Sequence, residues 1–161
     1  MGATAVIAPD QSLEAQWFDY NGHLNMAFYN VLFDRAVDHM YDLLGIGEAY
    51  AREGGGSCFT LQAHVNYLNE LSQGDTVSVA VQLVDFDAKR LHYFETMTNT
   101  NTGEVAATSE NMALHVDMST RRSAPFPESL LRGISELHAA HAALPVPELC
   151  GRGIAIPKRA P

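Results

Sequence analysis

The feature that most constrains the fold is a long apolar helix predicted from Asn25 to Leu44. Large apolar residues recur there at steps of three and four, and Gly45 and Gly47 then end the pattern. The repeating residues are Met26, Tyr29, Phe33, Ala36, Val37, Met40 and Leu44. A helix with so much apolar surface has to be enclosed on most of its sides. The remainder of the chain must therefore wrap it.

Strand-like segments supply the wrapping. Four alternating runs cover residues 58–68, 76–86, 90–99 and 105–117, with turn-like segments between them at 73–75, 87–89 and 101–103. The first run places one set of apolar side chains on a single face: Phe59, Leu61, Ala63, Val65 and Tyr67. Residues 12–18 favour a short additional strand. We expect a five-stranded antiparallel sheet, its four long strands in a meander, curled around the helix.

The predicted class is α+β, with one domain for the 161 residues. We expect an N-terminal arm over residues 1–11, the wrapped domain over 12–126, and a C-terminal helix and tail over 127–161. The helix in that last part spans 127–144 and begins at Pro127. Because the edges of such a sheet need cover, a homodimer or a dimer of dimers (a homotetramer) is predicted.

Composition excludes several classes of function. The net charge of −9 and the lack of a basic block argue against nucleic-acid binding. The chain contains two distant cysteines, Cys58 and Cys150, which indicates a reduced, cytoplasmic setting. No basic, apolar leader begins the sequence, and no apolar run approaches the roughly 20 residues of a membrane span. We expect no membrane association.

Familiar catalytic and metal motifs are missing, so no cofactor and no metal are predicted. There is no nucleophile elbow, zinc-protease motif or dinucleotide-binding glycine pattern. His138 and His141 are three residues apart but lack a third ligand nearby, which favours a solvated helix face. For His92 and His115, on predicted strands, we expect hydrogen-bonded structural roles.

Polar residues stand out where the long helix begins. Asp19 lies between aromatic residues, three positions before Gly22, which allows a tight turn. Backbone N–H groups around His23 to Met26 are free in the first helical turn and can bind an oxygen that gains negative charge. A carboxylate beside such donors can hydrolyse an activated ester or thioester. The alternative is that Asp19 caps the helix and Gly22 only turns the chain.

The stretch DYNGHLNMAFYNVLFDRA resembles the Asp-x-x-Gly-His-x-Asn-x-x-x-Tyr pattern of hotdog-fold acyl-CoA thioesterases of the 4-hydroxybenzoyl-CoA thioesterase class. The later HVNYLNELSQGDTV and ATSENMALHVDMSTRRSAPFP are also similar to that family, in the same order. The resemblance covers roughly residues 12 to 127. It implies the hotdog fold, a long helix wrapped by an antiparallel sheet, and an acyl-CoA substrate.

The resemblance also implies roles for individual residues. Asp19 becomes the catalytic carboxylate, either a general base on water or a nucleophile, and the Met26 backbone N–H becomes the oxyanion donor. Asn25 and Tyr29 would line the acyl site. Gly22 and His23 complete the substrate side of the turn, with no separate chemical role assigned to His23.

Further residues are implied by the way family members assemble. His64 and Asn66 lie on the strand that family dimers pair across the subunit interface, so they would reach the partner's Asp19. Arg121 and Arg122 follow the last strand and are candidates for coenzyme A phosphates. Solvated surface charge is the alternative for the two arginines.

A narrower set of matches resembles the betainyl-CoA thioesterases of bacterial carnitine metabolism, which in some bacteria are fused to L-carnitine dehydrogenase. The matches are DYNGHLNMAFYNVLFDRAVD, LVDFDAKRLHYFE and HVDMSTRRSAPFP. Betainyl-CoA carries a trimethylammonium group, which aromatic rings attract. Trp17 stands where many family members have a second Asp, which makes it the leading candidate for an aromatic cage. The chain also has Asn69-Glu70 where many members have Arg-Pro.

Two other functions stay open at this level. One is an acyl-CoA hydratase or dehydratase of the same fold, with Asp19 and His64 as acid and base. The other is an acyl-CoA binding module without catalysis, which leaves Asp19 without a purpose.

Overall fold

A long helix, α1 (Met26–Leu44), lies against the concave face of a curved antiparallel sheet. The computed structural model describes residues 4–156, so 1–3 of the expected arm and 157–161 of the expected tail lie outside the described residues. The Asn25 side chain caps the helix start, and Gly45 ends it with φ of 71°. The predicted end at glycine is confirmed, but the helix is buried along one face rather than on most of its sides, and the predicted core residue Met26 is exposed. The buried residues of α1 are Tyr29, Leu32, Phe33, Ala36, Val37, Met40 and Tyr41.

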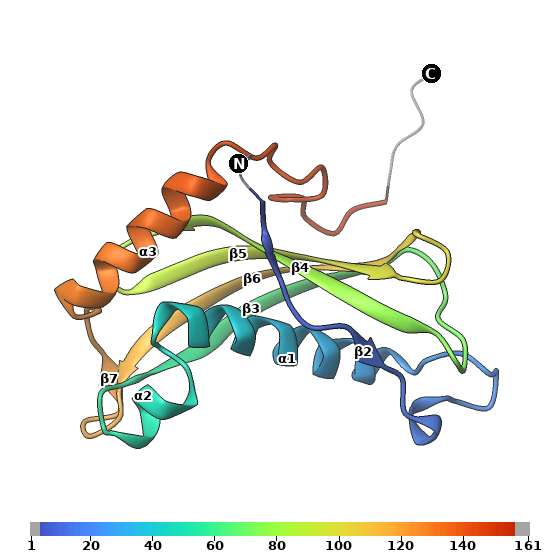
Figure 1. Cartoon of the computed structure of the whole chain (residues 1–161), viewed down its shortest axis with the longest axis horizontal. Coiled ribbons are helices and arrows are strands. Elements are labelled where there is room, and N and C mark those ends of the chain that lie inside the picture. The colour runs from blue at the N-terminus through green and yellow to red at the C-terminus, as the bar shows by residue number, and fades with distance from the viewer. Residues whose placement is uncertain (1–3, 157–161) are drawn as a thin grey trace.

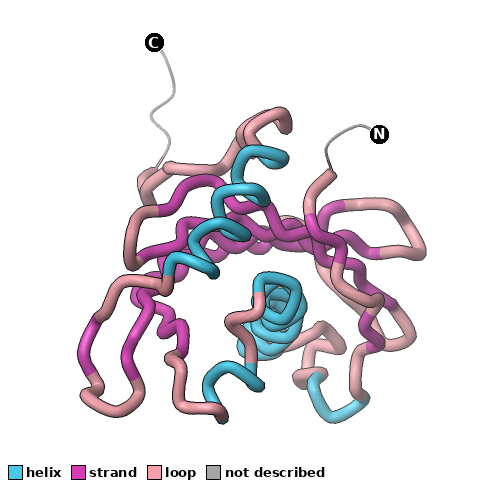
Figure 2. Tube along the Cα trace, turned by 60° about the vertical axis from the view of Figure 1, so that its left-hand side comes forward, coloured by secondary structure: helices cyan, strands magenta, loops and turns pink. Residues whose placement is uncertain are grey.

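The hotdog arrangement, a helix wrapped by an antiparallel sheet, is confirmed (Figures 1 and 2). The long strands are β3 (Ser57–Tyr67), β4 (Thr76–Phe86), β5 (Arg90–Asn99) and β6 (Val105–Asp117). Their order in the sheet is β4-β5-β6-β3, so the predicted four-strand meander is wrong for β3. Residues 68–75 carry the chain between opposite sides of the β5–β6 pair. The fully buried Leu71 anchors this crossing, and its carbonyl accepts from the Leu24 N–H.

The N-terminal segment differs from its prediction. Two short strands, β1 (Val6–Ile7) and β2 (Gln11–Ser12), both pair with β4, and another short strand pairs with β6. Within the described residues the sheet therefore has seven strands rather than the predicted five. The strand predicted over 12–18 is wrong, since residues Ala15–Trp17 form a single 3₁₀ turn. The Trp17 N–H donates to the Glu14 carbonyl at 2.9 Å. This turn directs the Trp17 side chain into the core, where it is buried.

Strand β3 is an edge strand within the part of the chain that the structure describes, since it pairs with β6 alone. The face expected to be apolar and inward is largely open. Phe59, Leu61 and Tyr67 are 39%, 53% and 43% exposed. The register with β6 shifts between Thr60 and Gln62, which breaks the simple alternation. An exposed apolar edge of this length needs a covering partner.

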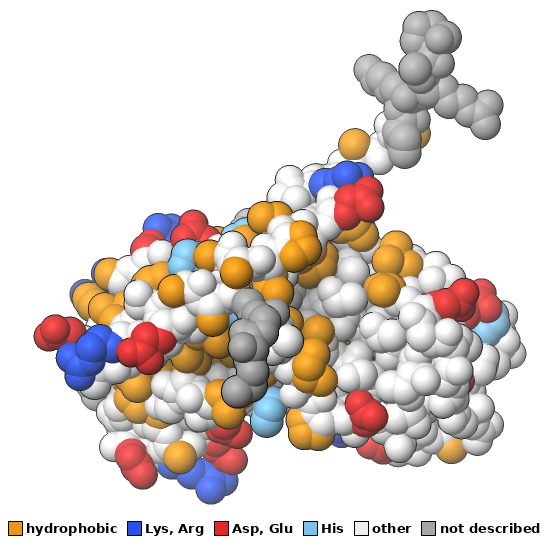
Figure 3. Space-filling view, turned by 45° about the horizontal axis from the view of Figure 1, so that its top comes forward, with side chains coloured by type: hydrophobic (Ala, Val, Ile, Leu, Met, Phe, Trp, Pro, Cys, Tyr) orange, Lys and Arg blue, Asp and Glu red, His pale blue; other side chains and the backbone are white. Residues whose placement is uncertain are grey.

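The opposite, outer face of the sheet carries α3 (Glu128–His141) and the C-terminal segment (Figure 1). In the view that brings this side forward, apolar side chains run across the middle of the surface (Figure 3). Two smaller elements, α2 (Glu48–Arg52) and β7 (Arg122–Ser123), lie near the end of α1. No helix among residues 4–156 combines the length and the apolar character that a membrane crossing requires.

His138 and His141 on α3 are not on a solvated face, so that prediction is wrong. The register of β4 and β5 shifts between Leu83 and Asp85. His141 Nδ1 accepts from the Leu83 N–H at 2.8 Å, and His138 Nε2 donates to the Val84 carbonyl at 3.1 Å. The two histidines thus supply the hydrogen bonds that the irregular strand lacks. Burial lowers the pKa of His141, which keeps its ring neutral and able to accept.

Candidate active site

The loop before α1 is a closed, hydrogen-bonded turn. Phe18 and Leu24 form an isolated bridge, and the Asp19 N–H donates to the His23 carbonyl at 3.0 Å. Gly22 has φ of 82° and donates its N–H to the Asp19 carbonyl at 3.0 Å. Only glycine adopts that φ without strain. The turn therefore holds Asp19 opposite His23, at the mouth of the helix.

At the start of α1, Asn25 accepts from two backbone donors of the first turn and leaves the Met26 N–H open. The Ala27 N–H donates to Asn25 Oδ1 at 3.0 Å, and the Phe28 N–H donates to the Asn25 carbonyl at 3.0 Å. The Met26 N–H has no acceptor among residues 4–156. Since Asn25 accepts from the Ala27 and Phe28 N–H groups, the Met26 N–H is the donor that the helix start can offer to a ligand.

A cavity of about 350 Å³ opens at this point. Its lining consists of His23, Leu24, Met26, Tyr29, Tyr67, Leu68, Asn69 and Glu70. Of the predicted site residues, the lining includes His23, Met26 and Tyr29. Trp17, Asp19, Gly22 and Asn25 stand outside the lining, in or beside the turn that shapes it. Tyr67 and Glu70 belong to the cavity although no site role was predicted for them.

Two tyrosines and one acid give the cavity its character. The rings of Tyr29 and Tyr67 meet edge to face, with centroids 5.1 Å apart. Tyr67 Oη donates to the Met26 carbonyl at 3.4 Å, which holds the end of β3 over the helix start. Glu70 pairs with His23 at 3.0 Å. Burial raises the pKa of Tyr29, so its hydroxyl stays protonated at neutral pH.

Asp19 retains an oxygen for chemistry. Its side chain is half-buried, and Oδ1 accepts from the Asn21 N–H at 2.8 Å. Oδ2 has no partner among the residues that the structure describes. The neighbouring Tyr20 is almost fully exposed and does not enclose the acid.

Trp17 is already engaged within the chain. Its ring stacks on Phe28 with centroids 5.2 Å apart, and the Arg35 guanidinium lies 5.2 Å from the ring centre. The side chain is 5% exposed. The cation that this ring holds in the structure therefore comes from Arg35.

The other four predicted residues lie apart from this cavity within one chain. Asn66 Nδ2 donates to Thr108 Oγ1, and His64 lines a different cavity, with Glu110. The Arg121 guanidinium lies 5.6 Å over the Phe59 ring, beside β7 and at the far end of β3 from the first turn of α1 (Figure 1).

Sequence reasoning also missed Glu95, an acid buried on the inner face of the sheet. Asn111 Nδ2 donates to Glu95 Oε2 at 3.0 Å, while Oε1 is buried without a partner in the described part of the chain. Burial, reinforced by Asp34, raises the pKa of Glu95 well above its ordinary value. Burial therefore favours the protonated form of this carboxyl group. In the sequence, Glu95 only interrupts the apolar face of its strand, and nothing else indicates its burial.

The wrapped helix, with its open first turn, defines the chain as a hotdog protein. The model of the thioesterase-like superfamily matches residues 13–134, and the chain belongs to that superfamily, a class of thioester hydrolases. The predictions of this family and of a thioester hydrolase are confirmed.

Individual relatives narrow the similarity. The chain is 42% identical over 142 residues to a betainyl-CoA thioesterase of Pseudomonas aeruginosa, covering 88% of this chain and 89% of that protein. A solved Staphylococcus aureus protein in complex with coenzyme A is 34% identical, with a TM-score of 0.87 and 98% of each chain covered. A solved protein of Pseudomonas putida is 39% identical, with a TM-score of 0.84, covering 98% of this chain and 100% of that one.

Proposed function

We propose that the chain hydrolyses betainyl-CoA to betaine and free coenzyme A. The observation that carries this proposal is the composition of the first-turn cavity. Met26, whose N–H has no acceptor among the described residues, lines one small space together with two tyrosines and Glu70. That combination fits a substrate that has a thioester carbonyl at one end and a compact cation at the other. The relative from Pseudomonas aeruginosa supports the same substrate.

In the proposed reaction the thioester carbonyl oxygen accepts a hydrogen bond from the Met26 N–H. Negative charge that develops on this oxygen is stabilised by the donor and by the positive end of the helix dipole. Asp19 Oδ2 takes a proton from the water that attacks the carbonyl carbon. The carbon–sulfur bond then breaks, the thiolate leaves and is protonated, and betaine departs as the carboxylate. Direct attack by Asp19, followed by hydrolysis of the anhydride, gives the same products.

The cation subsite is assigned to Tyr29, Tyr67 and Glu70 rather than to Trp17. The trimethylammonium nitrogen of betaine lies only two bonds from the thioester carbon, so its subsite must adjoin the Met26 N–H. Tyr29 and Tyr67 lie in that position, whereas the Trp17 ring is occupied by Arg35. A cation over a desolvated ring gains about 0.5–2 kcal/mol, and the Glu70 carboxylate adds its charge.

A homodimer formed through β3 would complete the site. Antiparallel pairing of two β3 edges about a two-fold axis places the Ser57 end of one strand beside the Tyr67 end of the other. Arg121 packs on Phe59, near that Ser57 end. Arg121 and Arg122 of one subunit would then lie beside the cavity of the next, where the coenzyme A phosphates emerge. The exposed apolar residues of β3 are buried in the same step.

The test uses two substrates of equal shape. Betainyl-CoA and 3,3-dimethylbutanoyl-CoA differ only in the quaternary atom, nitrogen in the first and carbon in the second. Free thiol release should show a kcat/KM at least about tenfold higher for the cation, because the cavity gains cation–π and carboxylate attraction. Tyr67→Leu should reduce kcat/KM for the cation by more than for the neutral analogue.

Trp17→Leu serves as the comparison variant, and it should affect both substrates alike. Equal loss for both substrates in Tyr67→Leu would overturn the cation subsite. No thiol release from any short acyl-CoA would overturn the activity itself.

A further inference from the structure

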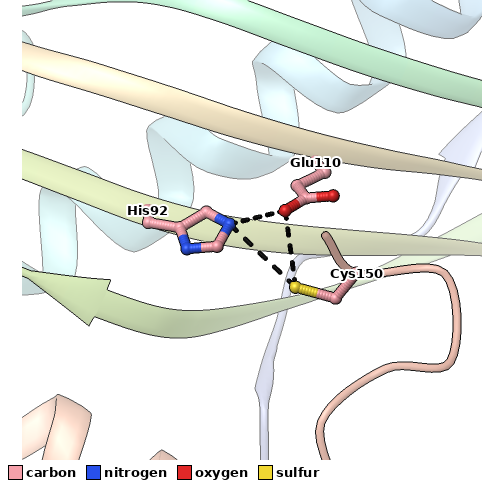
Figure 4. A group of neighbouring side chains, drawn as sticks. All are labelled: His92, Glu110 and Cys150. Carbon is pink, nitrogen blue, oxygen red and sulfur yellow. Dashed lines mark hydrogen bonds and ion pairs between the residues drawn. The ribbon is translucent and has the colours of Figure 1, made fainter. Parts of the chain in front are cut away.

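Three side chains that commonly bind metals converge on the outer face of the sheet, opposite α1. They are His92 on β5, Glu110 on β6 and Cys150 in the C-terminal segment (Figure 4). Their ligand atoms all lie within 4.8 Å of one another. His92 Nε2 is 2.7 Å from Glu110 Oε1, and Cys150 Sγ is 3.5 Å from that oxygen and 4.0 Å from the nitrogen.

The backbone of the C-terminal segment fixes the carboxylate. The Gly151 N–H donates to Glu110 Oε2 at 2.8 Å, so Oε1 is the oxygen that points at His92 and Cys150. Such hydrogen bonds to the non-ligating atom orient the ligand in protein metal sites. All three side chains are half-buried, which limits competition from water.

A cavity of about 520 Å³ adjoins the cluster. Its lining includes His64, His92, Glu110 and Gly151. His64 lies directly opposite Glu110 in the ladder of β3 and β6. The three convergent ligands therefore leave one side open toward a space that can hold water or a small ligand.

We propose that His92, Glu110 and Cys150 form a zinc-binding site that fastens the C-terminal segment to the outer face of the sheet. Tetrahedral zinc with bonds of about 2.0–2.3 Å separates its ligand atoms by about 3.3–3.7 Å. The sulfur–oxygen separation matches this spacing, and the other two differ from it by about 0.6 Å or less. Rotation of the side chains alone can close such differences.

The donor set selects the kind of metal. One sulfur, one imidazole nitrogen and one carboxylate oxygen suit a borderline ion such as Zn²⁺, whereas Mg²⁺ and Ca²⁺ prefer oxygen ligands alone. Binding converts the Cys150 thiol into a thiolate, so one proton leaves for each metal bound through sulfur. The ion would also replace the hydrogen bonds that now join the three side chains.

Metal titration of the whole chain, first treated with a chelator, tests this site. Calorimetry with Zn²⁺ should give one site per chain, with proton release that shows as a buffer-dependent enthalpy. Cys150→Ser and His92→Gln should each weaken binding by at least about tenfold. Cys58→Ala is the matched control, because Cys58 is the other cysteine and lies on β3 away from the cluster. Binding in that variant should be unchanged.

Cobalt provides a second, spectroscopic readout. Co²⁺ bound through Cys150 should show thiolate-to-metal charge-transfer absorption that Cys150→Ser abolishes and Cys58→Ala retains. Circular dichroism of each variant confirms that it is folded. Equal Zn²⁺ affinity in the wild type and Cys150→Ser, or Co²⁺ absorption without a thiolate band, would overturn the site and indicate binding by surface histidines alone.

Discussion

Two backbone N–H groups, one at the start of α1 and one in strand β4, both lack a partner in regular secondary structure. Only one of them receives an acceptor from elsewhere in the fold. At the start of α1 the Met26 N–H has no helical partner, and within the described residues nothing else accepts it. At the irregular point of β4 the Leu83 N–H is taken by His141. An unpaired buried donor costs about 1–3 kcal/mol.

This difference separates a donor whose pairing stabilises the fold from a donor that is open to a ligand. The Leu83 N–H is buried under α3, so the fold supplies an acceptor. Met26 lines a cavity that water or a ligand can enter, so its open N–H carries little cost in stability. A donor left open at a helix start is available for chemistry. If this comparison is correct, substitutions around the start of α1 change turnover, and substitutions around Leu83 change stability.

Asp19→Asn should have the largest effect. The amide keeps the size of the side chain and an oxygen to accept from the Asn21 N–H, but it can neither take a proton from water nor attack the carbonyl. We expect kcat to fall by about 10²–10⁴-fold, with the thermal midpoint nearly unchanged. Thiol release from betainyl-CoA measures the first quantity and calorimetry measures the second.

Asp10→Asn, in the segment between β1 and β2, is the matched control and should retain full turnover. Wild-type activity in Asp19→Asn would show that another group activates the nucleophile. The start of α1 would then not be the catalytic site.

His141→Leu should have the opposite effect to Asp19→Asn, with lower stability and unchanged turnover. The leucine fills the space but leaves the Leu83 N–H buried without an acceptor, so the free energy of unfolding should drop by about 1–3 kcal/mol. Turnover measured well below the unfolding temperature should stay near wild type. Urea unfolding gives the first quantity, and His138→Gln, which alters a more accessible contact to a carbonyl, should lose less.

The same histidine predicts a pH dependence. Burial lowers the pKa of His141 in the folded protein below its ordinary value of 6.5. Folding therefore favours the neutral ring. The contribution of this residue to stability is complete above about pH 6.5 and is lost as the pH falls toward the lower folded pKa. His141→Leu should show a flatter decline over that range, and parallel curves would remove His141 as the acid-sensitive group.

These two places also show what the sequence can and cannot predict. The boundaries of α1, β4, β5 and β6 followed from local periodicity, which the chain carries over many consecutive residues. The position of β3 beside β6 did not, because strand order depends on pairing between distant segments. His141 was missed for the same reason, since the irregularity in β4 that it completes has no signature in the pattern.

The same distinction between local and long-range information applies to the residues of the candidate site. The turn at Gly22 and the open helix start were readable from adjacent residues. Tyr67 and Glu70 were not assigned to the site, because they lie about forty residues away in the chain and meet the helix start only through the fold. For Trp17, sequence proximity to Asp19 does not reveal that Arg35 lies over its ring.

Asn25→Asp tests the oxyanion donor without removing any backbone group. Aspartate caps a helix as well as asparagine does, so stability should be retained or slightly raised. A carboxylate beside the Met26 N–H repels the developing oxyanion, since like charges a few ångströms apart near a surface repel appreciably. We expect kcat to fall by about tenfold, measured by thiol release. Asn25→Ser keeps a cap without the charge and should lose little, and equal rates for the two variants would place the oxyanion elsewhere.

Gly22→Ala should have the smallest effect and shows how finely the turn is set. No atom lies within 4 Å of a Cβ added at Gly22, so steric contact costs nothing and only the φ of 82° opposes the substitution. A left-handed residue other than glycine costs about 1 kcal/mol, and Asn tolerates this region better than Ala does. Urea unfolding should therefore rank the proteins wild type, Gly22→Asn, Gly22→Ala. If kcat also falls in this order, the turn sets the position of Asp19 relative to the Met26 N–H. Unchanged kcat with reduced stability would mean that the turn holds only the fold.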